Sequence, residues 1–384
     1  MTEAASIRVL HVVFSLDAGG MENGIVNASR ELERRGHEIH VCCLSRGGRF
    51  VERFCRPDRV SILGKREGLS PRTVGKLAAE IRRVNPTVIH THNLGPLIYT
   101  ALAAPAWKSR IVHGEHAELT PAELAPHRLL MRRLLYKRVR GIHTVSEGLR
   151  RSLIQQGFPP AMIGVVVNGV DTARFTPGSR VQARKETGLP RDATVLGLVG
   201  RYGAFKRHAA LIDAFERLRA GSVNTHLVFI GAGGPLEEEV RRRAAASPRA
   251  ECIHVAGFQA DARPWYRALD LLVVPSVNEG LSNALLEAMA CGIPALAHTA
   301  CGSADVLTDS ADGFLRDIGT PTALDAALAG ALRDPSRLPA LGAAARRTVE
   351  SRFSLGSMVD AYERLYRAPL TPYGARFAPA AIVK

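Results

Sequence analysis

The feature that most constrains the fold is a repeated alternation between short apolar runs and segments with helical spacing. The first run, residues 7–14, reads Ile-Arg-Val-Leu-His-Val-Val-Phe and meets a glycine turn before a helical stretch from about Met21 to Arg34. Nearly continuous apolar strands are typical of a parallel sheet that helices cover on both faces. The alternation therefore predicts an α/β protein with parallel sheets.

The alternation falls into two series. We expect strands near residues 38–44, 87–91, 110–113, 141–145 and 163–167, and then near 194–199, 226–230, 252–255, 271–274 and 293–297. Glycine and proline interrupt residues 171–192, which indicates a domain boundary. We predict one domain at 1–175, a second at 190–352, a helix at 353–367 that can return to the first domain, and an extended tail at 368–384.

The net charge of +15 is unevenly distributed. Residues 1–170 hold 25 Lys and Arg against 14 Asp and Glu, a net charge of +11. Such a field attracts phosphates, anionic lipid or nucleic acid. The aromatic content of 5% and the lack of a reader motif argue against nucleic acid.

Several familiar patterns are missing from the sequence. No apolar run reaches the roughly 20 residues of a membrane span, and the N-terminus lacks a signal pattern, so we expect a cytoplasmic protein. There is no Cys-x-x-Cys, no Asp-x-Asp, no phosphate loop, and no Gly-x-Gly-x-x-Gly after the first strand. We therefore expect no metal and no cofactor, and disfavour an ATPase or a dehydrogenase.

Two cations follow the strand that ends at Val199. Ligands in open parallel sheets bind beyond the carboxyl ends of the strands. The loop from Gly200 to Lys206 places Arg201 and Lys206 five residues apart at such an end. A guanidinium fork and an ammonium point charge suit a diphosphate, although an isolated pair of this kind is more often a solvated surface.

The most specific segment is residues 275–294, directly after the strand at 271–274. Glu279 lies in the loop, and Glu287 falls eight positions later on the first turns of the next helix. Both carboxylates can therefore face one ligand and accept hydrogen bonds from sugar or ribose hydroxyls, while amides near Asn283 hold phosphate. Taken alone, the two glutamates could simply complement a helix N-terminus.

This segment matches the Glu-x7-Glu motif of the retaining GT-B glycosyltransferases, and residues 7–367 resemble family 4 of those enzymes, the glycosyl transferases group 1. The resemblance also rests on short pieces that occur in the family's order: Gly19-Gly20-Met21-Glu22, His90-Thr91-His92-Asn93, Val145-Ser146-Glu147, Asn168-Gly169-Val170-Asp171 and Gly231-Ala232-Gly233. The N-terminal run together with Gly114-Glu115-His116 is similar to exopolysaccharide-associated sugar transferases.

The resemblance implies a GT-B fold, with two Rossmann-like domains that face each other across a cleft and the nucleotide sugar held by the second. Arg201 and Lys206 would stabilise the donor diphosphate without a metal. Glu279 would bind the transferred sugar and Glu287 the ribose. The implied donor site also includes Gly19 and Gly20, where the backbone approaches phosphate, and Gly280, Leu281, Ser282 and Asn283.

The resemblance also places a histidine near the reacting sugar. We assign it to His116, although His113 competes for the role. Two positions depart from the family pattern: Arg207 stands where glycine is common, and Asp305 stands near a position that often holds glutamate. Both bear on the donor geometry.

The predicted function is that of a retaining, metal-independent glycosyltransferase that moves a sugar from a nucleotide-diphosphate sugar to a glycan or lipid-linked acceptor in cell-surface or exopolysaccharide synthesis. The enzymatic alternatives are an epimerase of the same fold and a phosphorylase, although the cofactor-binding lysine segment of the latter is not found. The third alternative is an inactive nucleotide-sugar-binding scaffold.

A basic and leucine-rich segment, residues 128–138, is the candidate for peripheral contact with the inner face of the cell membrane. On a helical wheel, however, Arg133 and Lys137 fall between Leu129 and Leu130, so the apolar and basic faces do not separate. A packed helix with snorkelling cations explains the segment equally well.

Overall fold

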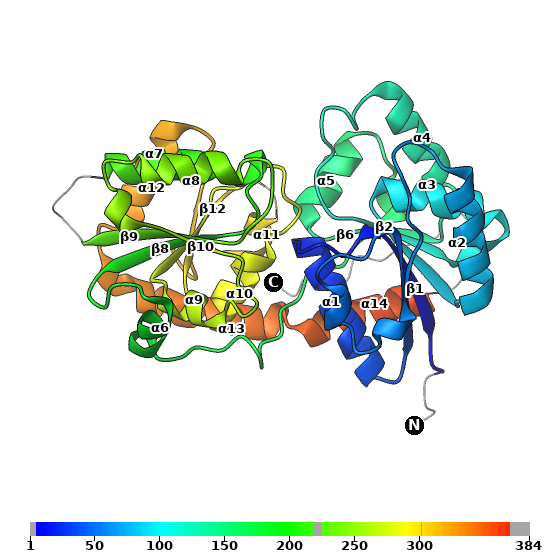
Figure 1. The fold of residues 1–384 in the computed structure, drawn as a ribbon, viewed down its shortest axis with the longest axis horizontal. Coiled ribbons are helices and arrows are strands. Elements are labelled where there is room, and N and C mark those ends of the chain that lie inside the picture. The colour runs from blue at the N-terminus through cyan, green and yellow to red at the C-terminus, as the bar shows by residue number, and fades with distance from the viewer. Residues whose placement is uncertain (1–4, 219–223, 301, 369–384) are drawn as a thin grey trace. The chain divides into compact units, whose positions relative to one another are not determined.

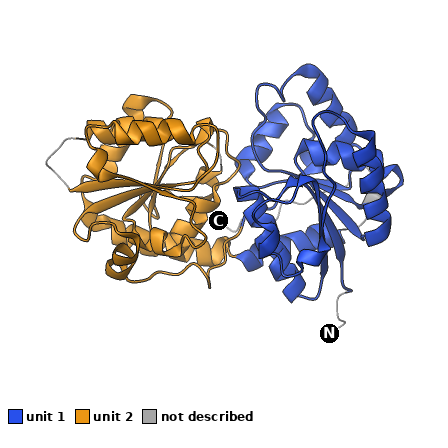
Figure 2. Cartoon of the chain, viewed as in Figure 1, with its two compact units in different colours: residues 1–168, 355–384 blue, residues 169–354 orange. Residues whose placement is uncertain are grey.

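The computed structural model describes residues 5–218, 224–300 and 302–368, which divide into two compact units (Figure 2). Unit 1 comprises Met1–Asn168 and Leu355–Lys384, and unit 2 comprises Gly169–Ser354. The change of unit thus falls between Asn168 and Gly169, whereas the sequence placed the end of the first domain at residue 175. The predicted tail lies, apart from Ala368, outside the described residues.

Unit 1 is built on a parallel sheet of seven strands in the order β3-β2-β1-β4-β5-β6-β7 (Figure 1). Its strands are β1 (Arg8–Ser15), β2 (Glu38–Arg46), β3 (Val60–Ile62), β4 (Val88–His92), β5 (Ile111–Glu115), β6 (Gly141–Thr144) and β7 (Ile163–Val165). Its helices are α1 (Gly20–Arg34), α2 (Pro71–Val84), α3 (Leu94–Ala103), α4 (Pro126–Tyr136), α5 (Glu147–Gln155) and α14 (Leu355–Arg367), with short turns η1 (Val51–Arg53), η2 (Pro57–Arg59), η3 (Pro105–Arg110) and η4 (Pro160–Met162).

Both faces of this sheet are covered, as the continuous apolar strands predicted. Because side chains alternate along a strand, Leu10 and Val12 pack toward α2, α3 and α5 on one face, whereas Val9 points toward α1 and α14 on the other. The last helix therefore belongs to unit 1, where Tyr362 and Tyr366 are buried.

Unit 2 is built on a parallel sheet of six strands in the order β10-β9-β8-β11-β12-β13 (Figure 1). Its strands are β8 (Thr194–Val199), β9 (Thr225–Ile230), β10 (Ile253–Gly257), β11 (Leu271–Val274), β12 (Ala295–His298) and β13 (Phe314–Arg316). Its helices are α6 (Arg180–Thr187), α7 (His208–Arg217), α8 (Glu237–Ala245), α9 (Arg263–Ala268), α10 (Asn283–Ala290), α11 (Ser303–Val306), α12 (Pro321–Ala331) and α13 (Leu338–Arg352), with turns η5 (Ala204–Lys206), η6 (Ala250–Cys252) and η7 (Pro335–Arg337).

The prediction of two Rossmann-like α/β domains is confirmed by these two parallel sheets with interleaved helices. The segment expected to link them, residues 171–192, instead contains α6 and belongs to unit 2. Ser179 caps this helix by accepting from the Gln182 amide, and Gly188 ends it in the left-handed region. Charged residues dominate α6, so no apolar stripe signals it. Its buried Arg184 pairs with Asp270, Nη2 to Oδ2 at 2.5 Å.

Candidate active site

The two loops that follow β8 and β9 approach each other closely in unit 2. Gly231 adopts a φ of +142°, and a Cβ at this position would lie 2.2 Å from the Gly200 carbonyl oxygen. The Gly200 amide in turn donates to the Ile230 carbonyl at 2.9 Å. A side chain at residue 231 would therefore push apart the loop that carries Arg201 and Lys206.

Lys206, one of the two predicted diphosphate ligands, forms an ion pair with the predicted sugar ligand Glu279. Lys206 is only 7% exposed, and its Nζ lies 2.7 and 2.9 Å from the two carboxylate oxygens of Glu279. The backbone supports this pair, because the Val277 amide donates to the Phe205 carbonyl at 2.9 Å and so joins the basic and acidic loops. The tertiary structure thus brings together two residues that are 73 positions apart.

Arg201 lies in the same loop as Lys206, directly beyond β8, and is exposed. Its side chain is therefore accessible to a ligand from solvent. A guanidinium beyond a strand end, together with an ammonium in the same loop, supplies the positive charge that a diphosphate requires. That Arg201 and Lys206 bind a diphosphate stays a prediction.

The acidic loop leads from β11 into α10. Gly280 and Leu281 lie in this loop, Ser282 is the N-cap residue and Asn283 begins the helix. In this described part of the chain the Ser282 side chain makes no capping hydrogen bond. The partial positive charge of the helix N-terminus favours an anionic group there.

Glu287 sits on the second turn of α10 and accepts a hydrogen bond of 2.7 Å from the Tyr266 hydroxyl. Tyr266 lies on α9 and is fully buried. Burial and the neighbouring Glu287 carboxylate raise the pKa of Tyr266 well above its ordinary value, so the hydroxyl keeps its proton and remains a donor. Tyr266 was not predicted from the sequence, because a tyrosine on a six-residue helix belongs to no motif.

Arg207, the first departure from the family pattern, has a structural role. Its φ of +57° is in the left-handed region, which explains why glycine is suited to this position. The guanidinium donates to the carbonyl oxygens of Ile318 at 2.5 Å and Gly319 at 3.1 Å. These bonds tie the loop that carries Arg201 and Lys206 to the segment after β13. Asp305, the second departure, lies on the short helix α11.

In unit 1, the predicted phosphate-approach residues lie where β1 meets α1. Gly19 is the N-cap residue of α1, and Gly20 is its first residue. The Gly19 carbonyl accepts from the Asn23 amide at 2.9 Å, so the turn leads directly into the helix. The first amides of α1 thus lie beyond the carboxyl end of β1, where open parallel sheets bind ligands.

His116 follows β5 and belongs to a cluster of histidine rings. Its Nε2 lies 2.9 Å from His92 Nδ1, and His92 Nε2 lies 2.9 Å from His11 Nδ1. A second pair joins His90 Nε2 to His143 Nε2 at 2.9 Å, and His90 Nδ1 to the Tyr366 hydroxyl at 2.8 Å. We call these five rings, from His11, His90, His92, His116 and His143, the histidine cluster.

Burial keeps the rings of the histidine cluster neutral. It lowers the pKa of His11 to about 3 and that of His116 to about 4, and it lowers the pKa of His90, His92 and His143 well below the ordinary value. His116 is therefore a neutral ring near pH 7, suited to hydrogen bonding rather than to carrying charge.

The segment from His90 to Asn93 was predicted only as part of the family resemblance, and its proximity to His11 and His143 was not predicted. A signal was present, because His90 and His92 occupy alternate positions of β4 and therefore share one face of the sheet. Gly114 makes room for them: a Cβ there would lie 2.7 Å from His143 Nε2 and 2.9 Å from His116 Nε2. Among the described residues, one ring nitrogen each from His11, His90 and His92 lie within 4.8 Å of one another, an arrangement that could hold a metal ion.

His113, the competitor of His116, belongs to a different buried network. Its Nε2 lies 3.2 Å from Glu115 Oε1, which also accepts from Tyr136 at 2.6 Å and Arg132 at 3.1 Å. Arg132 is fully buried and bonds Glu123 as well, at 2.8 Å. This cation of the basic segment thus holds the loop after β5 and does not face solvent.

The remainder of α4 exposes leucine and arginine side chains to solvent. Leu130 and Leu134, one turn apart, are each 56% exposed, and Arg128 and Arg133 are exposed beside them. No helix among the described residues has both the length and the apolar character to cross a membrane.

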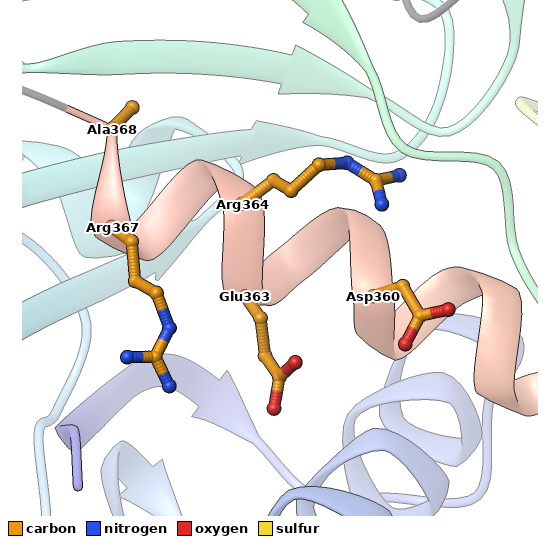
Figure 3. Close-up of a pocket in the computed structure, with 5 residues that line it drawn as sticks. All are labelled: Asp360, Glu363, Arg364, Arg367 and Ala368. Carbon is orange, nitrogen blue, oxygen red and sulfur yellow. The ribbon is translucent and has the colours of Figure 1, made fainter. Parts of the chain in front are cut away.

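A shallow pocket on α14 holds none of the predicted site residues. It is lined by Asp360, Glu363, Arg364, Arg367 and Ala368, and Figure 3 shows that Arg364 points to the opposite side of the helix from Glu363. Both of its carboxylates pair with Arg35, and Glu363 also pairs with His37 at 2.7 Å. These ion pairs attach α14 to unit 1, so the lining has a structural explanation.

Comparisons with known proteins give consistent results. Residues 18–174 match the family model for Glycosyltransferase Family 4, and residues 193–334 match that for Glycosyl transferases group 1. A D-inositol 3-phosphate glycosyltransferase of Thermobispora bispora is 30% identical over 365 residues, which cover 90% of this chain and 80% of the relative. D-inositol 3-phosphate glycosyltransferase 2 of Catenulispora acidiphila is 29% identical over 87% of this chain and 86% of its own length.

The fold is similar to that of solved glycosyltransferases. Anabaena HepE in complex with UDP and glucose superposes with a TM-score of 0.82 at 19% identity, covering 94% of this chain and 100% of HepE. A glycosyltransferase from Rickettsia africae gives 0.78 at 18% identity, with 94% and 98% covered.

Proposed function

Since the chain belongs to glycosyltransferase family 4 and has the GT-B fold, we propose that it transfers a sugar from a nucleotide-diphosphate sugar to a glycan or lipid-linked acceptor, with retention of configuration. The observation that carries the proposal is the Lys206–Glu279 ion pair beyond β8 and β11, beside the N-terminus of α10. It joins one group suited to phosphate and one suited to sugar hydroxyls where parallel sheets bind ligands.

Binding of the donor gives both members of this ion pair new partners. In the structure, the Glu279 carboxylate forms an ion pair with Lys206. A bound diphosphate offers Lys206 another anion, which frees Glu279 to accept hydrogen bonds from the transferred sugar. Glu287, held by Tyr266, binds the ribose hydroxyls. Arg201, exposed in the same loop, adds the second cation.

The transfer breaks the bond from the anomeric carbon to the donor phosphate oxygen and forms a bond from that carbon to an acceptor hydroxyl oxygen on the same face, while the hydroxyl proton passes to the departing diphosphate. Negative charge grows on the departing diphosphate, and Arg201 and Lys206 stabilise it without a metal ion. The family resemblance further assigns the backbone amides at Gly19 and Gly20 to phosphate and the neutral His116 ring to hydrogen bonding with the sugar, and these roles stay predictions. HepE was crystallised with UDP and glucose, which makes a UDP-sugar the first donor to test.

Thermal stabilisation by UDP-, GDP- and ADP-sugars without added metal tests the donor site. We expect a rise in Tm with one nucleotide class, lost in Arg201→Ala and Glu287→Ala. Arg242→Ala and Glu239→Ala, at exposed positions of α8, are matched controls that keep the rise. Absence of a rise with every donor contradicts the proposal. A rise in Tm without transfer to any acceptor favours the inactive nucleotide-sugar-binding scaffold. Conversion of the donor sugar without transfer favours the epimerase.

The acceptor side of the proposal includes contact with an anionic membrane surface. Exposed Leu130 and Leu134 with neighbouring cations form a surface suited to lipid headgroups, where a lipid-linked acceptor of cell-surface or exopolysaccharide synthesis is presented. Co-sedimentation with anionic vesicles at low salt, lost in the Leu130→Ser, Leu134→Ser double variant, supports this contact. Failure of the unmodified protein to co-sediment removes it. D-inositol 3-phosphate, the acceptor named for the relatives, belongs in the acceptor panel.

A further inference from the structure

The histidine cluster is unusual for its location. His11, His90 and His143 are, respectively, 2%, 0% and 0% exposed, on the sheet face where Val9, Val88 and Val112 form the apolar core with α14. Buried imidazoles on such a face cost free energy unless every polar nitrogen has a partner. The ordinary occupants of these positions are aliphatic side chains.

Two nitrogens of the cluster are not satisfied by the protein. Among the described residues, His11 Nε2 and His143 Nδ1 are buried and have no hydrogen-bond partner. The close pairs His11–His92 and His90–His143 bring ring nitrogens within 2.9 Å of each other, and each such contact needs one shared proton. Neutral rings can supply that proton to each contact, which leaves His11 Nε2 and His143 Nδ1 as the cluster nitrogens without a partner among the described residues.

The outer contacts have the form of a second coordination shell. His90 Nδ1 lies 2.8 Å from the Tyr366 hydroxyl, and His92 Nδ1 lies 2.9 Å from His116 Nε2. Metal-binding histidines typically donate their second N–H to such an outer partner, which fixes the tautomer and the ring orientation. The Nε2 atoms of His90 and His92 are then the nitrogens turned away from these partners.

We propose that His11, His90 and His92 bind a divalent transition-metal ion in the core of unit 1. One ring nitrogen of each lies within 4.8 Å of the other two. Tetrahedral coordination with bonds of about 2.0–2.1 Å separates neighbouring ligand atoms by roughly 3.3 Å, so small ring rotations complete the site. Three imidazoles without a carboxylate select Zn²⁺, or Co²⁺, Ni²⁺ and Cu²⁺, over Mg²⁺ or Ca²⁺.

The metal has a structural role and does not act on the donor diphosphate. It links β1 to β4, and through the His90–Tyr366 contact it reaches α14, so it connects the beginning of the chain to its last described helix. The transfer reaction proposed above remains metal-independent, and the two proposals stand or fall separately.

The test uses the full chain without an added histidine tag, stripped with a chelator and dialysed. We expect mass spectrometry to find one equivalent of Zn²⁺ retained after reconstitution, and we expect Zn²⁺ to raise Tm. Both effects are lost in His90→Gln and His11→Gln, with at least roughly 100-fold weaker binding. His127→Gln, at an exposed position of α4, and His226→Gln, in the separate His226–His254 pair of unit 2, keep them.

Co²⁺ provides a measurement that does not depend on folded variants. Tetrahedral nitrogen coordination of Co²⁺ in the unmodified protein gives visible d–d absorption, which disappears when Zn²⁺ displaces the Co²⁺. No such absorption and no Zn²⁺ at one equivalent overturn the proposal and leave the cluster as a hydrogen-bonded network of neutral rings. Loss of the metal in His226→Gln, but not in His90→Gln, also overturns it.

Discussion

Removal of the Tyr266 hydroxyl tests the support of Glu287 with a built-in control. Tyr266→Phe deletes a buried donor that lies 2.7 Å from the Glu287 carboxylate. Tyr202→Phe deletes a hydroxyl from another fully buried tyrosine of unit 2, whose oxygen has no hydrogen-bond partner among the described residues. The two substitutions are chemically identical and differ in the hydrogen bond that is lost.

The expected magnitudes follow from this difference. A hydrogen bond to a charged group contributes about 1.5–3 kcal/mol to stability, and water can partly replace it at the half-buried Glu287, so Tyr266→Phe costs roughly 1–2 kcal/mol. For a domain of this size that lowers Tm by about 2–8 °C. Tyr202→Phe removes an unsatisfied buried group and is neutral or stabilising by up to about 1 kcal/mol.

Urea denaturation and donor titration measure both consequences. Tyr266→Phe lowers the free energy of unfolding and also raises the donor KM, because Glu287 is no longer held in one orientation, while kcat changes less. Tyr202→Phe does not lower the free energy of unfolding and leaves the donor KM unchanged. Equal destabilisation by the two substitutions would refute the reasoning, as would an unchanged donor KM in Tyr266→Phe.

Three further substitutions test other parts of the structure. Arg207→Gly relieves a left-handed backbone that costs about 1 kcal/mol but loses charged hydrogen bonds worth about 1.5–3 kcal/mol each, so calorimetry finds a lower Tm; a higher Tm contradicts this. Burial raises the pKa of Glu115, but the His113 contact and the nearby guanidinium bring it down from 4.5 to about 2. The unmodified protein therefore has a stabilisation of about 3 kcal/mol above pH 4.5, and it loses this stabilisation as the pH falls toward 2. Glu115→Gln lacks the stabilisation at every pH. Parallel stability–pH profiles for the two proteins contradict this. Gly231→Ala places a Cβ 2.2 Å from the Gly200 oxygen and so pushes the two loops apart. A donor that raises the Tm of the unmodified protein therefore does not raise the Tm of the variant, whereas an unchanged rise shows that the loops tolerate separation.

The sequence by itself determined the two parallel sheets, because continuous apolar runs predict buried strands and apolar residues at helical spacing predict helices. Both patterns are contained in short stretches of the chain. It also pointed to Lys206 and Glu279, in the loops beyond β8 and β11, and to Glu287 on the second turn of α10. Their roles, like those of Arg201 and His116, stay predictions. The highly charged helix α6 escaped detection because it lacks an apolar stripe, so the linker that its glycines and prolines indicated is a helix of unit 2.

Only the tertiary structure decided which distant residues meet. The Lys206–Glu279 pair spans 73 positions, and the Tyr266–Glu287 bond depends on how α9 packs beside α10. The histidine cluster forms because β4 pairs with β1, which places His90 beside His11 although they are far apart in the chain. Local propensities set the strands and helices, but the pairing order of the sheet decides which side chains share a face, and no short window of sequence contains that order.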